Sequence, residues 1–230
     1  PTWEEMDVSS VIPSGATGVM MMVFHYSYSA QSCGFRKKGS TDSHDEETSG
    51  RTYFSVIVGL DSNRVFEYRN PRNNQTSYDF YVNGYTTSPM ATNGTDITPA
   101  GGLSAWSGVS LAGVIPTGTT IAFIEVFGIG AIGFRPTGSV DNRIDTTANY
   151  KNLDTVIVVL DTALSFEFYR SDVGQTIWLR GYSSGAATAP TISTNISPTV
   201  YGSYEVVIVP TNQRLVVIEA IASGLTNPHW

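Results

Sequence analysis

The chain contains the same nine-residue pattern twice, and this repetition constrains its fold more than any other feature of the sequence. The copies are residues 34–42 (Gly-Phe-Arg-Lys-Lys-Gly-Ser-Thr-Asp) and 133–141 (Gly-Phe-Arg-Pro-Thr-Gly-Ser-Val-Asp). Flanking landmarks recur in the same order: Trp3 with Trp106, 12–15 with 115–118, 56–61 with 156–161, 66–68 with 166–168, and 84–85 with 181–182. An ordered self-match is the signature of repeated structural units, so the sequence predicts a tandem duplication.

The duplication and the composition together predict an all-β fold. Only 14% of the 230 residues are charged and 11% are aromatic, and short alternating runs are separated by Gly, Ser, Asn and Pro, which is typical of strands joined by turns. We predict two tandem antiparallel β-sandwich units, jelly-roll or Ig-like, followed by a C-terminal strand pair. The predicted boundaries are 1–87 for the first sandwich, 88–104 for a linker without periodicity, 105–184 for the second sandwich, and 185–230 for a linker and the strand pair. Within the second sandwich, 121–134 is predicted to form two buried strands around a glycine-rich bend.

The C-terminal segment matches the start of a third repeat. Residues 209–212 and 215–220 align with 115–118 and 121–126, and no counterpart of the later strands follows. Two strands alone cannot bury an apolar face, so they require an open sheet edge, either in this chain or in a neighbour. Leu215, Val216, Val217 and Ile218 are apolar on both strand faces, and we predict that they act in assembly.

Charge and hydropathy exclude two classes of partner. The net charge of −7 and the pI near 4.8 argue against nucleic acid as the main partner. No stretch reaches the roughly 18 uninterrupted apolar residues of a membrane span. Low charge in a soluble protein is more often seen where surface is buried against other subunits, so we expect a homo-oligomer.

Cys33 is the only cysteine, which rules out an intrachain disulfide, and we expect it to be a small buried hydrophobe.

The repeated arginines suggest a structural role for the turns that follow them. Arg36 and Arg135 each follow Gly-Phe and precede Gly-Ser-x-Asp, which ends in Asp42 or Asp141. An Asp at this place can accept backbone hydrogen bonds within its own turn and form an ion pair with the Arg. We therefore predict that each Arg clamps its turn through the Asp.

The other chemically active residues do not form a recognisable catalytic or metal-binding group. Residues 44–47 (His-Asp-Glu-Glu) resemble metal ligands, but consecutive acidic residues on a loop are usually a solvated tip, and metal sites need ligands from several segments. His25 lies in an apolar run and is expected to be a core or interface histidine. There is no phosphate loop and no zinc spacing. We expect no metal, no cofactor and no enzymatic activity.

Four glutamates remain as candidates for glycoside hydrolysis. Glu67 and Glu167 occupy equivalent places in the repeats, and Glu125 and Glu219 interrupt apolar runs. A catalytic carboxylate pair must lie about 5–10 Å apart in one cleft, and equivalent positions in separate sandwiches do not meet in this way. The simpler interpretation is an outward-facing strand position with an ion pair.

One family resemblance can be drawn from these landmarks. The series Trp3, 7–9 (Asp-Val-Ser), 12–16, 34–42, 58–61, 66–67 and 84–85 resembles β-sandwich modules in structural proteins of tailed phages, which include capsid-decorating, head-fibre and tail-associated proteins. The second copy departs from the pattern at Pro136, Thr137 and Val140. The resemblance implies a non-enzymatic structural role on the virion surface, with other virion proteins as partners, and it carries over no functional residues.

Two rival functions are compatible with the sequence. Abundant Tyr and Trp and Asn-rich loops would suit a carbohydrate-binding adhesin module, with surface glycans as partners. A polysaccharide hydrolase that uses Glu67 or Glu167 is a weaker rival. Saturable binding on a glycan array would favour the adhesin.

Overall fold

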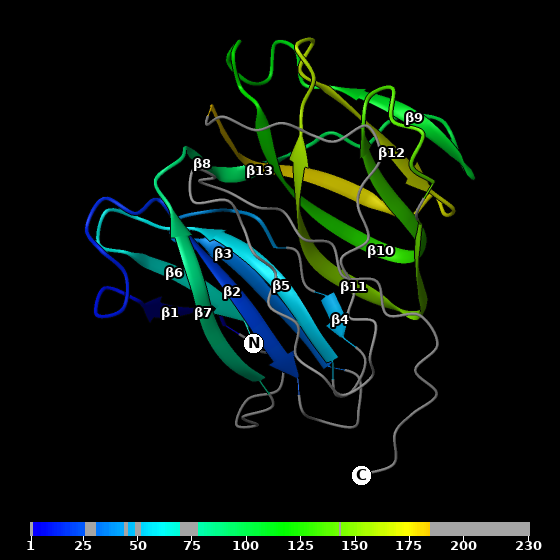
Figure 1. Cartoon of the computed structure of the whole chain (residues 1–230). Coiled ribbons are helices and arrows are strands. Elements are labelled where there is room, and N and C mark those ends of the chain that lie inside the picture. The colour runs from blue at the N-terminus through cyan, green and yellow to red at the C-terminus, as the bar shows by residue number, and fades with distance from the viewer. Residues whose placement is uncertain are drawn as a thin grey trace, which may run out of the picture.

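The computed structural model describes residues 2–25, 31–43, 46–48, 52–69, 78–142 and 144–184 (Figure 1). These residues form an all-β structure whose strands pair antiparallel in sheets. No helix that could cross a membrane is found among them. The predicted C-terminal strand pair, with Leu215, Val216, Val217 and Ile218, lies outside the described residues.

The first unit is a sandwich of two sheets. One sheet has the order β1 (Glu4–Asp7), β6 (Val65–Arg69), β3 (Gln31–Lys37), β4 (Glu46–Thr48), and the other has the order β5 (Thr52–Gly59), β2 (Gly18–His25), β7 (Tyr78–Thr86). Along β2 the burial alternates, so that Val19, Met21 and Val23 are at most 2% exposed. This alternation follows from the two-residue period of a strand that turns one face toward the opposite sheet.

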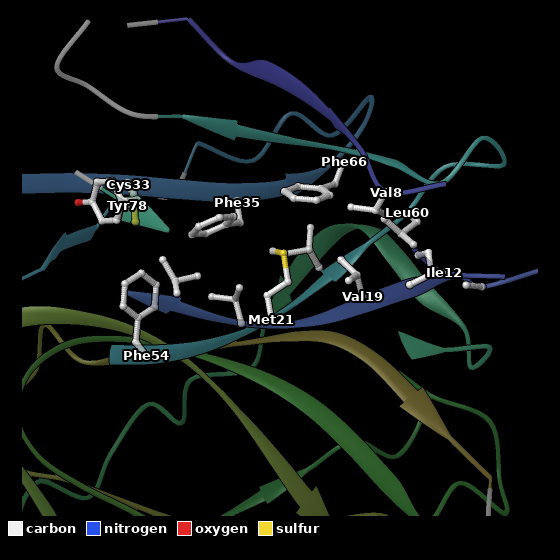
Figure 2. Close-up of a cluster of buried hydrophobic side chains, with 14 residues drawn as sticks. Val8, Ile12, Val19, Met21, Cys33, Phe35, Phe54, Leu60, Phe66 and Tyr78 are labelled. Carbon is white, nitrogen blue, oxygen red and sulfur yellow. The ribbon is translucent and has the colours of Figure 1, made fainter. Parts of the chain in front are cut away.

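The core of the first unit lies between these two sheets, as Figure 2 shows. Val19 and Met21 project from β2 toward Phe35 and Phe66 of the other sheet, and the rings of Phe35 and Phe66 lie 6.5 Å apart between centroids. Cys33 is 2% exposed and belongs to the same cluster, which confirms its prediction as a buried hydrophobe. Burying each large side chain contributes roughly 1.5–3 kcal/mol, so this cluster is the main source of the first unit's stability.

The second unit has the same kind of core but shares one long strand between its layers. Its strand order is β8 (Met90–Asp96), β13 (Thr176–Ser183), β10 (Ile121–Pro136), β12 (Ser165–Arg170), β9 (Ala105–Ser110), with β11 (Asp145–Val159) also paired to β10. The predicted glycine-rich bend is present, but β10 continues through it as one strand. Gly128 and Gly130 have φ of 126° and 118°, a backbone region that favours glycine, and the register with β11 shifts between them.

The two units share one scheme of strand pairing. In both, the strand that carries the repeated Arg pairs with the strand that carries the Glu, and a register shift falls next to an equivalent glycine. The corresponding pairs are Arg36↔Glu67 and Arg135↔Glu167, Cys33↔Glu46 and Ile132↔Asp145, and Met20↔Gly84 and Phe123↔Gly181. The sequence self-match thus corresponds to equivalent structural positions, while the duplication event itself stays a prediction.

The segment 88–104 differs from the linker that the sequence predicts. It joins the two units along the chain, but it contains the strand β8, which pairs with β13 at the edge of the second unit's sheet. Its sequence, Met-Ala-Thr-Asn-Gly-Thr-Asp, lacks an apolar alternation. Because β8 is stabilised by pairing with β13 and not by a buried face of its own, its sequence gives no periodic signal.

The two units contact each other through a small apolar cluster. Its buried members are Ile57 from β5, Met90 from β8, and Ile121 and Phe123 from β10. Beside it, the backbone N–H of Ile57 donates to Oγ1 of Thr155 in β11, at 3.1 Å. The junction is therefore packed, and it does not consist of a solvated linker alone.

The packing of β8 on β13 predicts that alanine substitutions at two equivalent glycines change stability differently. A Cβ on Gly181 would lie 2.6 Å from Met90 Sδ and 2.7 Å from the Pro89 carbonyl oxygen, whereas a Cβ on Gly84 would meet only Met20 Sδ at 3.7 Å. We expect Gly181→Ala to lower the free energy of unfolding by about 1–3 kcal/mol through overpacking. Gly84→Ala should be neutral or slightly stabilising. Chemical denaturation measures both, and equal effects would contradict the packing of β8 on the second unit.

Candidate functional site

The repeated arginine forms the same cluster in both units. In the first unit Arg36 Nε donates to Glu67 Oε2 at 2.6 Å, and its Nη1 donates to the main-chain carbonyl of Asp42 at 2.9 Å. In the second unit Arg135 donates to Glu167 at 2.6 Å and to the carbonyl of Asp141 at 2.7 Å. All four charged side chains are at most 22% exposed. Each Arg therefore ties a strand pair to the turn that follows it.

The predicted role of the turn carboxylates needs a correction. The Arg does hold its turn, but it does so through the main-chain carbonyl of Asp42 or Asp141, and its ionic partner is the Glu on the adjacent strand. The physical reason is register: Arg36 lies directly opposite Glu67, and Arg135 directly opposite Glu167, which brings cross-strand side chains within ion-pair distance. The carboxylate of Asp42 instead points to the second unit.

A tryptophan completes each cluster. The guanidinium carbon of Arg36 lies 4.1 Å from the ring centroid of Trp3, and that of Arg135 lies 4.1 Å from the ring centroid of Trp106. Such cation–π contacts favour a positive charge over the aromatic face. In the sequence, Trp and Arg recur in the same order in both units. This joint recurrence was the only signal of the contact, and it does not show that the two side chains touch.

Glu67 and Glu167 are not brought together as a catalytic pair. They lie in different units, on β6 and β12, and each forms an ion pair with the arginine of its own unit. Both are partly buried, in place of the outward-facing positions that the sequence suggested. Their arrangement supports strand pairing and offers no shared cleft for hydrolysis.

The most buried ionic group among the described residues lies at the junction of the two units. Arg180 on β13 binds Glu125 on β10 through two bonds, Nε to Oε2 at 2.6 Å and Nη2 to Oε1 at 2.8 Å. Its Nη1 donates to Oδ2 of Asp42, in the turn of the first unit. The three side chains are between 8% and 11% exposed. One guanidinium thus bridges two carboxylates that come from different units.

The protonation of Arg180 follows from this arrangement. Burial acts to lower the pKa of its guanidinium, but the charges and hydrogen bonds of Glu125 and Asp42 outweigh burial and raise this pKa above its ordinary value. A buried charge of this kind is tolerated only where partners replace its lost hydration. The bridge is therefore held in its charged form.

The strand β8 lies against the same turn. Oδ1 of Asn93 accepts hydrogen bonds from Ser40 Oγ at 2.9 Å and from the N–H of Thr41 at 3.0 Å. The N–H of Gly94 donates to Asp42 Oδ2 at 2.8 Å. A Cβ at Gly94 would lie 2.8 Å from Nη1 of Arg180, so a side chain at this position would force the guanidinium to shift. We define the junction site as Asp42, Asn93, Gly94, Glu125 and Arg180.

Sequence reasoning found only part of the junction site. It singled out Asp42 as a turn residue and Glu125 as a charge within an apolar run, and it missed Asn93, Gly94 and Arg180. Arg180 also interrupts an apolar strand, Thr-Ile-Trp-Leu-Arg-Gly-Tyr-Ser. Two opposite charges in two apolar strands were the one signal from which a buried pair could have been inferred.

The remaining candidates do not add a chemical site. His25 is fully buried and stacks on Tyr78 with 4.6 Å between ring centroids, which confirms the expected core position. Of the predicted metal-like segment 44–47, residues 44 and 45 lie outside the described residues, and Glu219 does as well. Among the residues that the structure does describe, no group of three His, Cys, Asp or Glu could hold a metal ion.

The hollows of the described surface differ in size and lining. A cavity of about 20 Å³ at the junction, lined by Glu125, Arg180 and Met90 among others, has room for about one water molecule. A hollow of about 430 Å³ lies beside Thr17, Lys37 and Asp61. Its described lining residues include no aromatic side chain on which a sugar ring could stack.

Comparison with known proteins gives no match: no protein-family model matches the chain, and no curated protein and no solved structure is significantly similar to it. The resemblance to phage virion modules therefore stays a hypothesis. The functional proposal depends on the geometry of the chain itself.

The arginine cluster predicts a coupled loss of stability in each unit. Arg135→Ala and Arg36→Ala should each lower the free energy of unfolding by about 1–3 kcal/mol, because a partly buried glutamate loses its charged partner. In a double-mutant cycle, Arg135→Ala combined with Glu167→Ala should cost less than the sum of the two single substitutions. Denaturation curves that both arginine substitutions leave unchanged would contradict the clamp.

The bridge at the junction predicts a larger loss of stability, part of which a second substitution should restore. Arg180→Met should destabilise the protein by about 3–5 kcal/mol, because it leaves the carboxylate of Glu125 buried without its ionic partner. Replacing both side chains, as Arg180→Met with Glu125→Met, should recover part of that loss, since the carboxylate of Glu125 is then no longer buried without its ionic partner. If the double variant is less stable than Arg180→Met alone, the pairing is not the source of the effect.

Proposed function

We propose that the protein is a non-enzymatic structural protein of a phage virion surface and that it acts through protein–protein assembly. Its place would be that of a capsid-decorating, a fibre or a tail-associated protein. The observation that carries this proposal is the junction, where β8 and a buried ionic bridge join two equivalent sandwich units into one body. Such a body presents its surfaces in a fixed relation, which is what an ordered protein shell or fibre requires.

The physical character of the junction supports this role. Interfaces between domains of one chain are commonly polar and allow relative motion. Here an apolar cluster around Ile57 and Phe123 lies next to the buried bridge of Arg180 with Glu125 and Asp42. A hinge motion between the units would expose this apolar cluster and separate the buried charges. Both changes cost free energy, so they oppose the motion.

The proposed partners are other virion proteins and further copies of the same chain, with the virion as the location. Within this proposal Leu215, Val216, Val217 and Ile218 serve assembly, because a strand pair of this composition requires an apolar cover. No nucleic acid, membrane, metal or cofactor takes part in the proposed role.

The test compares the intact chain with one that ends after Ser197. Both forms are added to particles that lack the protein, and the retained protein is quantified by mass spectrometry after sedimentation. We expect the intact chain to be retained in a fixed ratio to the major capsid or tail protein, and the truncated chain to fold but to be retained poorly. Equal retention would remove the strand pair from assembly, and absence of the intact chain from purified particles would contradict the virion role.

A carbohydrate-binding adhesin remains the second candidate, and one observation favours it. Tyr81 and Tyr85 on β7 are each 48% exposed, and exposed tyrosine rings can stack on sugars. Saturable binding of the isolated protein on a glycan array, lost in Tyr81→Ala and Tyr85→Ala, would support the adhesin and weaken the assembly role.

A further inference from the structure

Among the described residues, no strand covers the outer edge of β7 in the first unit, whereas a strand covers the equivalent edge of the second unit. In the second unit β13 pairs with β10 on one side and with β8 on the other. In the first unit β7 pairs with β2, and among the described residues it forms the edge of its sheet. A free edge presents unpaired N–H and C=O groups and is a template for an added strand.

The exposure of equivalent side chains shows what this missing strand would cover. Val82 is 39% exposed, whereas its equivalent Leu179 is 5% exposed. The equivalence follows from the shared register, in which Val82 pairs with Met21 and Leu179 pairs with Ile124. Tyr81 is 48% exposed. The edge of β7 is thus an apolar surface at positions that are covered in the second unit.

The sequence of β8 and of the residues after it recurs once in the chain. Residues 92–99 are Thr-Asn-Gly-Thr-Asp-Ile-Thr-Pro, and residues 191–198 are Thr-Ile-Ser-Thr-Asn-Ile-Ser-Pro. The first two of the three Thr positions, the Ile and the Pro are identical, while Asp becomes Asn and the third Thr becomes Ser. The second copy lies near the end of the chain, outside the described residues.

Three positions that bind the second unit's edge keep their side-chain chemistry in the second copy. The hydroxyl of Thr98 accepts a hydrogen bond from the N–H of Ile177 at 2.9 Å, and the N–H of Ile97 donates to the carbonyl of Ile177 at 3.0 Å. Asp96 accepts from the N–H of Thr98 at 2.9 Å and fixes the local turn. Ser197, Ile196 and Asn195 preserve a hydroxyl, the isoleucine and a side-chain oxygen at these places.

Two positions that bind the preceding unit lose their chemistry in the second copy. Asn93 and Gly94 hold the turn of the first unit through Ser40 and Asp42, and their places in the second copy are taken by Ile192 and Ser193. Isoleucine has no side-chain acceptor for such bonds. Residues 191–198 thus retain the chemistry for pairing with a β13-like edge and lose the chemistry that ties the strand to the unit before it.

We infer that the β7 edge of one molecule accepts residues 191–198 of a second copy as an added antiparallel strand, and this inference rests on the assembly role proposed above. The register of β8 on β13, in which Trp178 lies opposite Asp96 and Leu179 opposite Thr95, places Tyr81 opposite Asn195 and Val82 opposite Thr194. Since the acceptor is in the first unit and the donor follows the second, the contact is head-to-tail. Such a contact generates a ring or a filament.

Disulfide trapping between two single-cysteine variants tests the inference. Tyr81→Cys and Asn195→Cys proteins are mixed in a thiol–disulfide buffer, and the covalent dimer is measured on a non-reducing gel. Opposed residues in a strand pair have Cα atoms about 4.5–5.5 Å apart, a distance that a disulfide can span. Cys33 is 2% exposed and stays in place, and the unsubstituted protein controls for it.

Two further pairs calibrate the result. Tyr85→Cys mixed with Asn195→Cys is the matched control, because Tyr85 is also 48% exposed on β7 but lies four residues, or about 13 Å, out of register. Asp96→Cys with Trp178→Cys in one chain reproduces the observed equivalent pair. We expect the Tyr81 mixture to give several-fold more dimer than the Tyr85 mixture.

The outcomes separate this inference from the virion role. Equal yields from both mixtures, or no dimer from either, overturn the strand-acceptor edge. A chain that carries both Tyr81→Cys and Asn195→Cys and closes only on itself overturns the second copy as the source of the strand. If retention on particles is intact while the Tyr81 mixture gives no dimer, the inference fails and the virion role stands; if the dimer forms but the chain is absent from particles, the virion role fails.

Discussion

The guanidinium of Arg180, buried between Glu125 and Asp42, is the interaction on which the arrangement of the two units depends. Taking three charged groups out of water is costly unless each finds close partners, and here the partners come from β10, from β13 and from the turn of the other unit. Because the bridge forms only when all three segments are in place, it fixes the second unit relative to the turn at Asp42. Gly94 allows this close approach, since a Cβ at that position would lie 2.8 Å from Nη1 of Arg180 and would force it to shift.

The same turn is held from its other side by the repeated arginine cluster. Arg36 binds the carbonyl of Asp42, and this leaves the Asp42 carboxylate available to the second unit. In the second unit Arg135 holds the carbonyl of Asp141 in the same way. The cluster with Glu and Trp is therefore the element common to both units, and the bridge through Arg180 is built on it. At the position equivalent to Arg180 the first unit has Asn83, which is exposed, so the two units differ where the junction forms.

The self-match of the sequence predicts the fold. The sequence does not predict side-chain contacts between residues that are far apart in the chain. Ordered landmarks such as Trp3 and Trp106 predicted two units of the same plan, because recurrence carries information that a single alternating run lacks. The clamp of Arg36 on its turn was predicted correctly, but its carboxylate partner was wrong, since only the strand register reveals that Glu67 lies opposite. The strand β8 escaped prediction because its Thr, Asn and Gly residues match a loop composition. Arg180 interrupts an apolar strand, but its partners Glu125 and Asp42 are far away in the chain, so the local sequence does not identify them.

We expect the two units to unfold as one cooperative body, because the bridge at Asp42 joins them. Asp42→Ala removes the inter-unit arm and leaves the pair of Arg180 and Glu125 within the second unit, while Asp79→Ala, an exposed carboxylate on β7, controls for the loss of one negative charge. Scanning calorimetry of the intact chain should show a single transition for the unsubstituted protein and for Asp79→Ala, and two separated transitions for Asp42→Ala. Two transitions in the unsubstituted protein, or one unchanged transition in Asp42→Ala, would contradict the claim.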